Sequence, residues 1–154
     1  MKKISRFLLI GLILIIFNQY SNAQIVLQRC DIKTNWQSSN SLSIDNGDQK
    51  EGRGSLQCTG DETDWFKKVF SQTDVGVDET GYLSFWLYVS DVSVFDGDGQ
   101  VEITSSGVAD TDEYNWAVST IGLINGWNHV KLALSNAGKT GTPTLNAIKY
   151  FRIP

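Results

Sequence analysis

The eight residues from Tyr82 to Val89 alternate between two sets of side chains, and this alternation constrains the fold more than any other feature. The apolar set is Leu83, Phe85, Leu87 and Val89, and the other set is Tyr82, Ser84, Trp86 and Tyr88. A period of two residues is that of a β-strand with one face in a core. After residue 23, no window repeats apolar residues at helical spacing, so we predict an all-β fold.

Similar short runs recur along the chain, separated by segments dense in Asp, Asn, Gly and Ser that are typical of turns. The predicted strands are residues 24–29, 42–44, 55–59, 65–70, 82–89, 101–106, 113–121, 127–134 and 147–153. Eight or nine short strands at such intervals favour a two-sheet antiparallel β-sandwich, or jelly roll. No repeat or linker is visible, so a single domain is predicted.

The first 23 residues are predicted to be a signal peptide. Lys2, Lys3 and Arg6 precede an apolar run of about eleven residues, which matches the three-part pattern of secretion signals. A membrane-spanning helix needs about 20 apolar residues, so we expect cleavage after Ala23 and no stable membrane anchor. The domain of residues 24–154 is therefore expected to be secreted or periplasmic, or to lie at the cell surface.

The charge balance limits the partners of this domain. The chain has 13 basic and 17 acidic residues, and removal of the three basic residues of the leader changes the net charge from −4 to −7. Phosphate backbones and anionic membranes attract basic surfaces, so this acidic balance argues against both as partners. We expect a neutral ligand or a cation instead.

Two cysteines, Cys30 and Cys58, remain after removal of the leader. In an oxidising compartment, an even number of cysteines in a small chain favours a disulfide over a metal site. Such a bridge would close a loop of about 28 residues and stabilise the fold by roughly 3 kcal/mol. The alternative is a pair of free thiols.

Four stretches together resemble the galactose-binding-like jelly roll that many extracellular carbohydrate-binding modules share. They are Cys30-Asp31 followed by Trp36, KEGRGSL at residues 50–56, YLSFWLYV at residues 82–89 and GWNHVKL at residues 126–132. The resemblance implies a non-catalytic domain that binds a polysaccharide or glycoconjugate. Such a domain would act alone or beside a separate enzyme or surface protein.

The same resemblance implies a structural calcium ion. The acids that match the family's ligands are Asp31, Asp45, Asp48 and Glu51, and Asn146 stands where an aspartate is expected near the C-terminal end. Calcium takes six to eight oxygen ligands, which carboxylates and carbonyls in an acidic, Gly-rich loop can supply. The alternative is that residues 45–48 form a polar turn, because Asp and Asn bond to their own backbone there.

Eight residues are predicted to contact carbohydrate. Trp86 and Tyr88 lie opposite the predicted core face, where exposed rings could cover the apolar side of a pyranose. The polar candidates on neighbouring strands, which could share that face, are Glu102, Asn115, His129 and Lys131, and the candidates in or beside polar loops are Trp36 and Trp65. The alternative is that the aromatic side chains are buried, since strand aromatics commonly belong to a core.

Little in the sequence indicates an enzyme. A glycosidase needs two carboxylates, one on each side of the bond that it cleaves. The acids Glu102, Asp110, Asp112 and Glu113 cluster near one predicted β-connection, but clustering alone does not define an acid–base pair. A catalytic zinc site needs several His or Cys ligands, whereas the chain has one histidine, His129. No Gly-x-Ser-x-Gly nucleophile motif occurs. A structural or adhesive domain that binds protein is the main alternative function, and a polysaccharide-degrading enzyme is a further one.

Overall fold

The computed structural model describes residues 24–59, 65–76, 78–94 and 98–153, and every regular element longer than three residues in them is a β-strand. The prediction of an all-β chain is therefore confirmed. The predicted signal peptide, residues 1–23, lies outside the described residues. Within the described part there is no helix whose length and apolar character would let it span a membrane.

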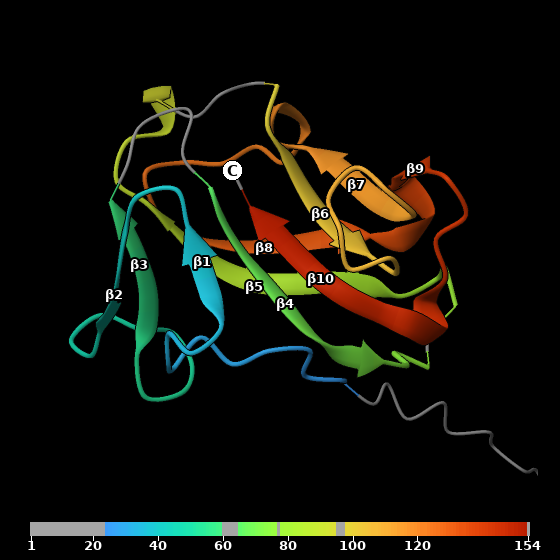
Figure 1. Cartoon of the computed structure of the whole chain (residues 1–154). Coiled ribbons are helices and arrows are strands. Elements are labelled where there is room, and N and C mark those ends of the chain that lie inside the picture. Colours follow the sequence, from blue (N-terminus) through green and yellow to red (C-terminus); the bar gives the residue numbers. More distant parts are fainter. Residues whose placement is uncertain (1–23, 60–64, 77, 95–97, 154) are drawn as a thin grey trace, which may run out of the picture.

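Ten strands are hydrogen-bonded in three antiparallel sheets (Figure 1). The strands are β1 (Trp36–Ser38), β2 (Ser41–Asp45), β3 (Ser55–Thr59), β4 (Phe66–Thr73), β5 (Tyr82–Val89), β6 (Gln100–Thr104), β7 (Glu113–Ala117), β8 (Gly126–Ala133), β9 (Gly138–Thr140) and β10 (Ile148–Ile153). Six of them form one sheet in the order β1-β4-β10-β6-β7-β9, while β2 pairs with β3 and β5 pairs with β8. Four single 3-10 turns connect strands: η1 (Val92–Val94), η2 (Val118–Thr120), η3 (Leu134–Asn136) and η4 (Leu145–Ala147).

One apolar core lies between the six-stranded sheet and the β5–β8 pair, which runs behind β4, β10 and β6 in Figure 1. The six-stranded sheet and the turns beside it contribute Val101, Ile103, Tyr114, Trp116, Ile148 and Ile153, and β8 contributes Val130 and Leu132. The apolar set of β5 packs against this cluster, as its alternation predicted. Burial of such side chains is the main favourable term in folding.

The strands with strong alternation were predicted best. β3 and β5 have the predicted bounds, and β2, β4, β6, β8 and β10 differ from theirs by a few residues. Residues 24–29 form no strand, so that prediction is wrong. The three-residue strands β1 and β9 were missed, because so few residues show no periodicity.

The predicted disulfide is wrong. Cys30 and Cys58 are both free thiols and do not lie close together. The Sγ atom of Cys58 instead shares a hydrogen bond of 2.8 Å with Oγ of Ser38. A disulfide requires the two Cα atoms to lie within about 7 Å, and an even count of cysteines carries no information about that distance.

Removal of a core side chain should destabilise the fold strongly. Ile148 is fully buried in the core, so Ile148→Ala is expected to lower the free energy of unfolding by about 2–5 kcal/mol. Urea denaturation followed by tryptophan fluorescence measures this change. The control is Ile124→Ala, since Ile124 is 64% exposed and should change the free energy by less than about 0.5 kcal/mol.

The free thiols give a second test of the structure. Thiol titration of the unfolded protein without reductant should find both Cys30 and Cys58 reactive, because neither is held in a disulfide. Treatment with a reductant should leave the melting temperature unchanged, because no cross-link is lost. A mass increase of two protons on reduction would contradict this expectation.

Candidate functional site

Four aromatic side chains lie on the side of the β5–β8 pair that points away from the core. We call Tyr82, Trp86 and Tyr88 of β5, together with Trp127 of β8, the aromatic face. Tyr82, Trp86 and Tyr88 are 56%, 38% and 52% exposed. The alternative that the rings of Trp86 and Tyr88 belong to the core is therefore wrong. Large aromatic side chains that remain in water commonly mark a binding surface.

Cross-strand pairing holds three of these aromatic side chains in place. Trp86 lies directly opposite His129 in the β5–β8 register, and the two rings stack with centroids 4.5 Å apart and planes inclined by 18°. The His129 ring also shares a hydrogen bond of 3.0 Å between its Nε2 and Oγ of Ser84. Tyr88 lies opposite Trp127, with ring centroids 5.5 Å apart in an edge-to-face arrangement. Such pairs stabilise neighbouring strands and orient their rings.

Lysine side chains lie over the aromatic face. The Nζ atom of Lys131 is 4.2 Å from the ring centroid of Tyr82. Lys50, from the connection between β2 and β3, places its Nζ 5.9 Å from the Trp86 ring and 5.6 Å from the Trp127 ring. Neither lysine forms an ion pair with another described residue. The aromatic face therefore carries positive charge on a chain that is acidic overall.

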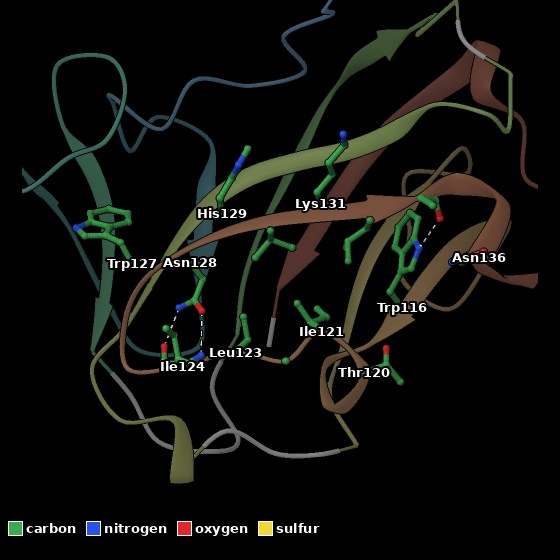
Figure 2. A pocket seen from close by; sticks show the side chains of 14 residues that line it. Trp116, Thr120, Ile121, Leu123, Ile124, Trp127, Asn128, His129, Lys131 and Asn136 are labelled. Atoms are coloured by element: carbon green, nitrogen blue, oxygen red, sulfur yellow. Dashed lines mark hydrogen bonds between the residues drawn. The ribbon is translucent and has the colours of Figure 1, made fainter.

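A groove of about 730 Å³ runs along the free edge of β8, beside the aromatic face (Figure 2). Its lining includes Trp127, His129 and Lys131 of β8 and, on the other side, the segment from Thr120 to Ile124. Asn128 holds the two sides together: its Oδ1 accepts a hydrogen bond of 2.9 Å from the Ile124 backbone N–H, and its Nδ2 donates to the Ile124 carbonyl. The groove and the aromatic face thus share residues and form one continuous surface.

A second polar region lies on the opposite side of the core, on the outer face of the six-stranded sheet. The strand register places Arg152 opposite Glu102, Tyr150 opposite Thr104, and Thr104 opposite Glu113. Val101 and Ile103 of β6 face the core, so their alternating neighbours Glu102 and Thr104 face away from it. Glu102, Glu113 and Tyr150 are nonetheless almost completely buried. We call Glu102, Asp110, Glu113, Tyr150 and Arg152 the acidic cluster.

The connection between β6 and β7 folds back over these side chains and covers them. The backbone N–H of Asp110 donates a hydrogen bond of 2.9 Å to Oε2 of Glu113, and that of Gly107 donates one of 3.1 Å to Oγ1 of Thr104. Asp110 adopts a left-handed φ of 58°, which Asp and Asn tolerate better than most residues. This tight turn brings the exposed Asp110 carboxylate next to the two buried glutamates.

Arg152 is the cation of the acidic cluster. One of its guanidinium nitrogens forms an ion pair with Oε1 of Glu102 and lies 3.7 Å from Oδ1 of Asp110. The second oxygen of Glu102, Oε2, is buried without a hydrogen-bond partner among the described residues, and so is the hydroxyl of Tyr150. Unpartnered buried polar atoms are rare because each one costs free energy on folding.

Burial raises the pKa of Glu102 to about 7, and Arg152 only partly opposes this shift. The nearby carboxylates of Glu113 and Asp110 raise the pKa further, because a second negative charge in one site is unfavourable. A cavity of about 340 Å³ opens beside Glu102, and its lining includes Trp65, Gln100, Asp110 and Arg152. Perturbed carboxyl groups beside a cavity are candidates for functional sites.

The structure divides the predicted carbohydrate-binding residues between these two regions. Trp86, Tyr88, His129 and Lys131 share the outer side of the β5–β8 pair. Glu102 and Asn115 instead lie on the outer face of the six-stranded sheet, and Trp65 borders the cavity there. The expectation that all the polar candidates would share one face with Trp86 is therefore wrong.

Trp36 was expected at a loop rim, and that prediction is wrong. Its side chain is only 7% exposed and packs against Phe66 and Phe151, with ring centroids 5.9 Å and 6.1 Å away. The rings belong to neighbouring strands of the six-stranded sheet, so Trp36 packs into the fold at the end where β1 pairs with β4.

Three of the acids predicted to bind calcium, Asp45, Asp48 and Glu51, lie at the end of β2 or in its connection to β3, and Asp31 accepts a hydrogen bond from the Arg53 backbone N–H of that connection. No three of the acids Asp31, Asp45, Asp48 and Glu51 form a group of neighbouring carboxylates among the residues that the structure describes. Asp45 Oδ1 accepts hydrogen bonds from the backbone N–H groups of Gly47 and Asp48, which is the polar turn of the alternative interpretation. Asp48 Oδ1 accepts a hydrogen bond from Nε1 of Trp127. A calcium site at these acids and Asn146 stays a prediction.

Several residues of both regions were missed by the sequence reasoning. Tyr82 and Trp127 of the aromatic face were not among the predicted binding residues, although the alternation of β5 placed Tyr82 on the same face as Trp86. Lys50, Tyr150 and Arg152 come from parts of the chain distant in sequence from the residues that they contact. No local signal shows such contacts, because they depend on which strands pair.

Comparison with known proteins adds no further assignment. No family model, no curated protein and no solved structure matches this chain. The function is therefore inferred from the two regions themselves.

The raised pKa of Glu102 predicts a pH-dependent stability. Between about pH 4.5 and pH 7 the folded protein keeps a proton on Glu102 that the unfolded chain has released, so stability falls as the pH rises through this range. Glu102→Gln removes this titration. As the pH rises from about 4.5 to 7, the free energy of unfolding of the variant should therefore increase by about 1–3 kcal/mol relative to that of the wild type.

Urea denaturation in metal-free buffer, repeated every half unit of pH, measures this difference. The matched control is Glu51→Gln, which makes the same change of charge at an exposed position. Its stability should follow the wild type at every pH. Parallel curves for the wild type and Glu102→Gln would show that Glu102 titrates normally.

Proposed function

We propose that this chain is a secreted, non-catalytic carbohydrate-binding domain whose ligand lies across the aromatic face. The exposure of Tyr82, Trp86 and Tyr88 in one row carries this proposal. Aromatic rings cover the apolar C–H side of a sugar, while amide and charged groups around them bond its hydroxyls. His129 and Lys131 supply such groups along the adjoining groove.

We also propose that the three sheets together form a jelly roll of the galactose-binding-like kind. The shared core between the six-stranded sheet and the β5–β8 pair supports this arrangement, because a β-sandwich buries side chains from two facing sheets. In such a sandwich the β2–β3 pair would extend one layer, and the aromatic face would be the outer surface of the other. The site, rather than the fold, carries the functional proposal.

The lysines over the aromatic face do not prevent a sugar from binding, because their side chains can be displaced. A cation above an exposed aromatic ring gains only about 0.5–1 kcal/mol, so a sugar can displace the Lys131 and Lys50 side chains from the rings. The displaced ammonium groups can then bond to ligand oxygens. The stack between Trp86 and His129 stays in place during this exchange and keeps the Trp86 ring oriented.

The charge of the aromatic face favours an acidic glycan. Lys50 and Lys131 bring two positive charges to this surface, and the Asp48 carboxylate, which accepts a hydrogen bond from Trp127, brings one negative charge, so a positive charge remains. Carboxylate or sulfate groups on a polysaccharide would pair with the two ammonium groups, whereas the rest of the acidic chain would repel them. The ligand class that we propose is therefore a polysaccharide with uronate or sulfate groups, in place of the neutral ligand expected from the net charge alone.

Substitution of the central aromatic residue should test this function. Trp86→Ala is expected to weaken binding of an acidic polysaccharide, such as polygalacturonate or chondroitin sulfate, about tenfold, because one stacked ring contributes roughly 1 kcal/mol or more. Affinity electrophoresis in gels that contain each polysaccharide measures the change. Neutral glucans should retard the protein less than the acidic polymers, and added NaCl should reduce the difference.

The matched control is Trp65→Ala, which removes the same side chain from the other side of the core. This variant should bind like the wild type. A wild-type protein that no polysaccharide retards would favour the alternative of a structural or adhesive domain that binds protein. Loss of binding in Trp65→Ala alone would move the carbohydrate site to the cavity beside Glu102.

A further inference from the structure

We propose that the acidic cluster is a binding site for a divalent metal ion, with calcium as the ion that fits best. This site is independent of carbohydrate binding, because it lies on the opposite side of the core from the aromatic face. Its residues also differ from the acids that the sequence resemblance implied. The proposal rests on how the carboxylates converge, on their charge and on two buried oxygen atoms without partners.

Three carboxylates meet at this point of the fold. One oxygen each from Glu102, Asp110 and Glu113 lies within 4.8 Å of the other two. Three points no more than 4.8 Å apart all lie within about 2.8 Å of a common centre, which is close to the roughly 2.3–2.6 Å of calcium–oxygen bonds. A small closing movement of the exposed Asp110 side chain brings all three oxygens to bonding distance.

The acidic cluster has an excess of negative charge that a bound cation would neutralise. With all three carboxyl groups ionised, as binding of a cation requires, the cluster carries three negative charges, and Arg152 supplies one positive charge through its contacts with Glu102 and Asp110. The remaining two negative charges equal the charge of one divalent ion. Arg152 bonds Oε1 of Glu102, so this ion pair leaves Oε2 of the same carboxylate available to the metal.

Two buried oxygen atoms without hydrogen-bond partners are a second observation that supports a metal ion at this point. Glu102 is fully buried, yet its Oε2 has no hydrogen-bond partner among the described residues. The hydroxyl of Tyr150 has none either, although Tyr150 is only 2% exposed and interacts electrostatically with Glu102, Asp110 and Glu113. A metal ion would satisfy Glu102 directly, and a water on that ion could bond the phenol.

The other groups of the cluster are already held in position. Oε1 of Glu113 accepts hydrogen bonds from Nδ2 of Asn115 at 2.7 Å and from Oγ1 of Thr140 at 3.3 Å, and its Oε2 accepts the Asp110 backbone N–H. Each carboxylate oxygen has two lone pairs, so Oε2 can still bind a metal. Such supporting bonds fix the orientation of ligands in metal sites.

The ligand chemistry selects calcium among common divalent ions. All candidate ligands are oxygens, whereas zinc prefers histidine and cysteine. Magnesium demands near-ideal octahedral geometry at about 2.0–2.1 Å, which this irregular group of side chains does not offer. The cavity beside Glu102 and Arg152 gives water access to the remaining coordination positions of a calcium ion.

Titration of metal-free protein tests the site directly. Addition of CaCl2 after EDTA treatment should raise the melting temperature, because an ion that binds only the folded state stabilises it. Terbium should give luminescence sensitised by tryptophan, and calcium should displace it. The test variant is Asp110→Asn, since its side chain is exposed and asparagine also tolerates the left-handed backbone there. This variant should need at least tenfold more calcium for half of the effect.

The comparison variant is Asp45→Asn, which makes the same change of charge at the last residue of β2, one of the calcium ligands that the resemblance implied, and retains an acceptor for the Gly47 N–H. Its response to calcium and terbium should equal that of the wild type. Glu113→Gln provides a second variant and should also weaken binding. The proposal is overturned if CaCl2 gives no shift, if MgCl2 at equal ionic strength gives an equal one, or if Asp45→Asn loses the response and Asp110→Asn keeps it.

Discussion

The pairing of β10 with both β4 and β6 holds the six-stranded sheet together. β1 and β4 come from the first half of the chain, β6, β7 and β9 come from the second half, and in the described part β10 alone pairs with a strand of each group. Successive side chains of a strand point to opposite faces. β10 therefore gives Phe151 and Ile153 to the apolar core, and it gives Tyr150 and Arg152 to the acidic cluster.

The two candidate regions are built in the same way but have opposite electrostatic character. In each, a cross-strand pair sets the geometry: Trp86 opposite His129 on the aromatic face, and Arg152 opposite Glu102 in the acidic cluster. The aromatic face is exposed and carries lysines without ion pairs to described residues. The glutamates of the acidic cluster are buried, and the cluster carries more carboxylates than cations. The core separates them, so a glycan and a metal ion would bind without competing.

The sequence predicted the features that depend on neighbouring residues along the chain, and it missed the contacts that depend on which strands pair. Alternation within β5 was sufficient to predict the strand, its buried set and the common face of Trp86 and Tyr88, because side-chain direction along a strand has a fixed period. It could not show that β6 pairs with β10, so the partnership of Glu102 with Arg152 was invisible. The disulfide prediction failed for a related reason, since a count of cysteines contains no distance.

The place of β10 in the sheet also determines the order in which the fold can form. This strand follows every other strand of the described chain, yet it occupies an interior position between β4 and β6. Pairing between segments so distant in sequence is slow, because the loss of loop entropy precedes the contacts that compensate it. The main sheet therefore closes only after β10 has been synthesised.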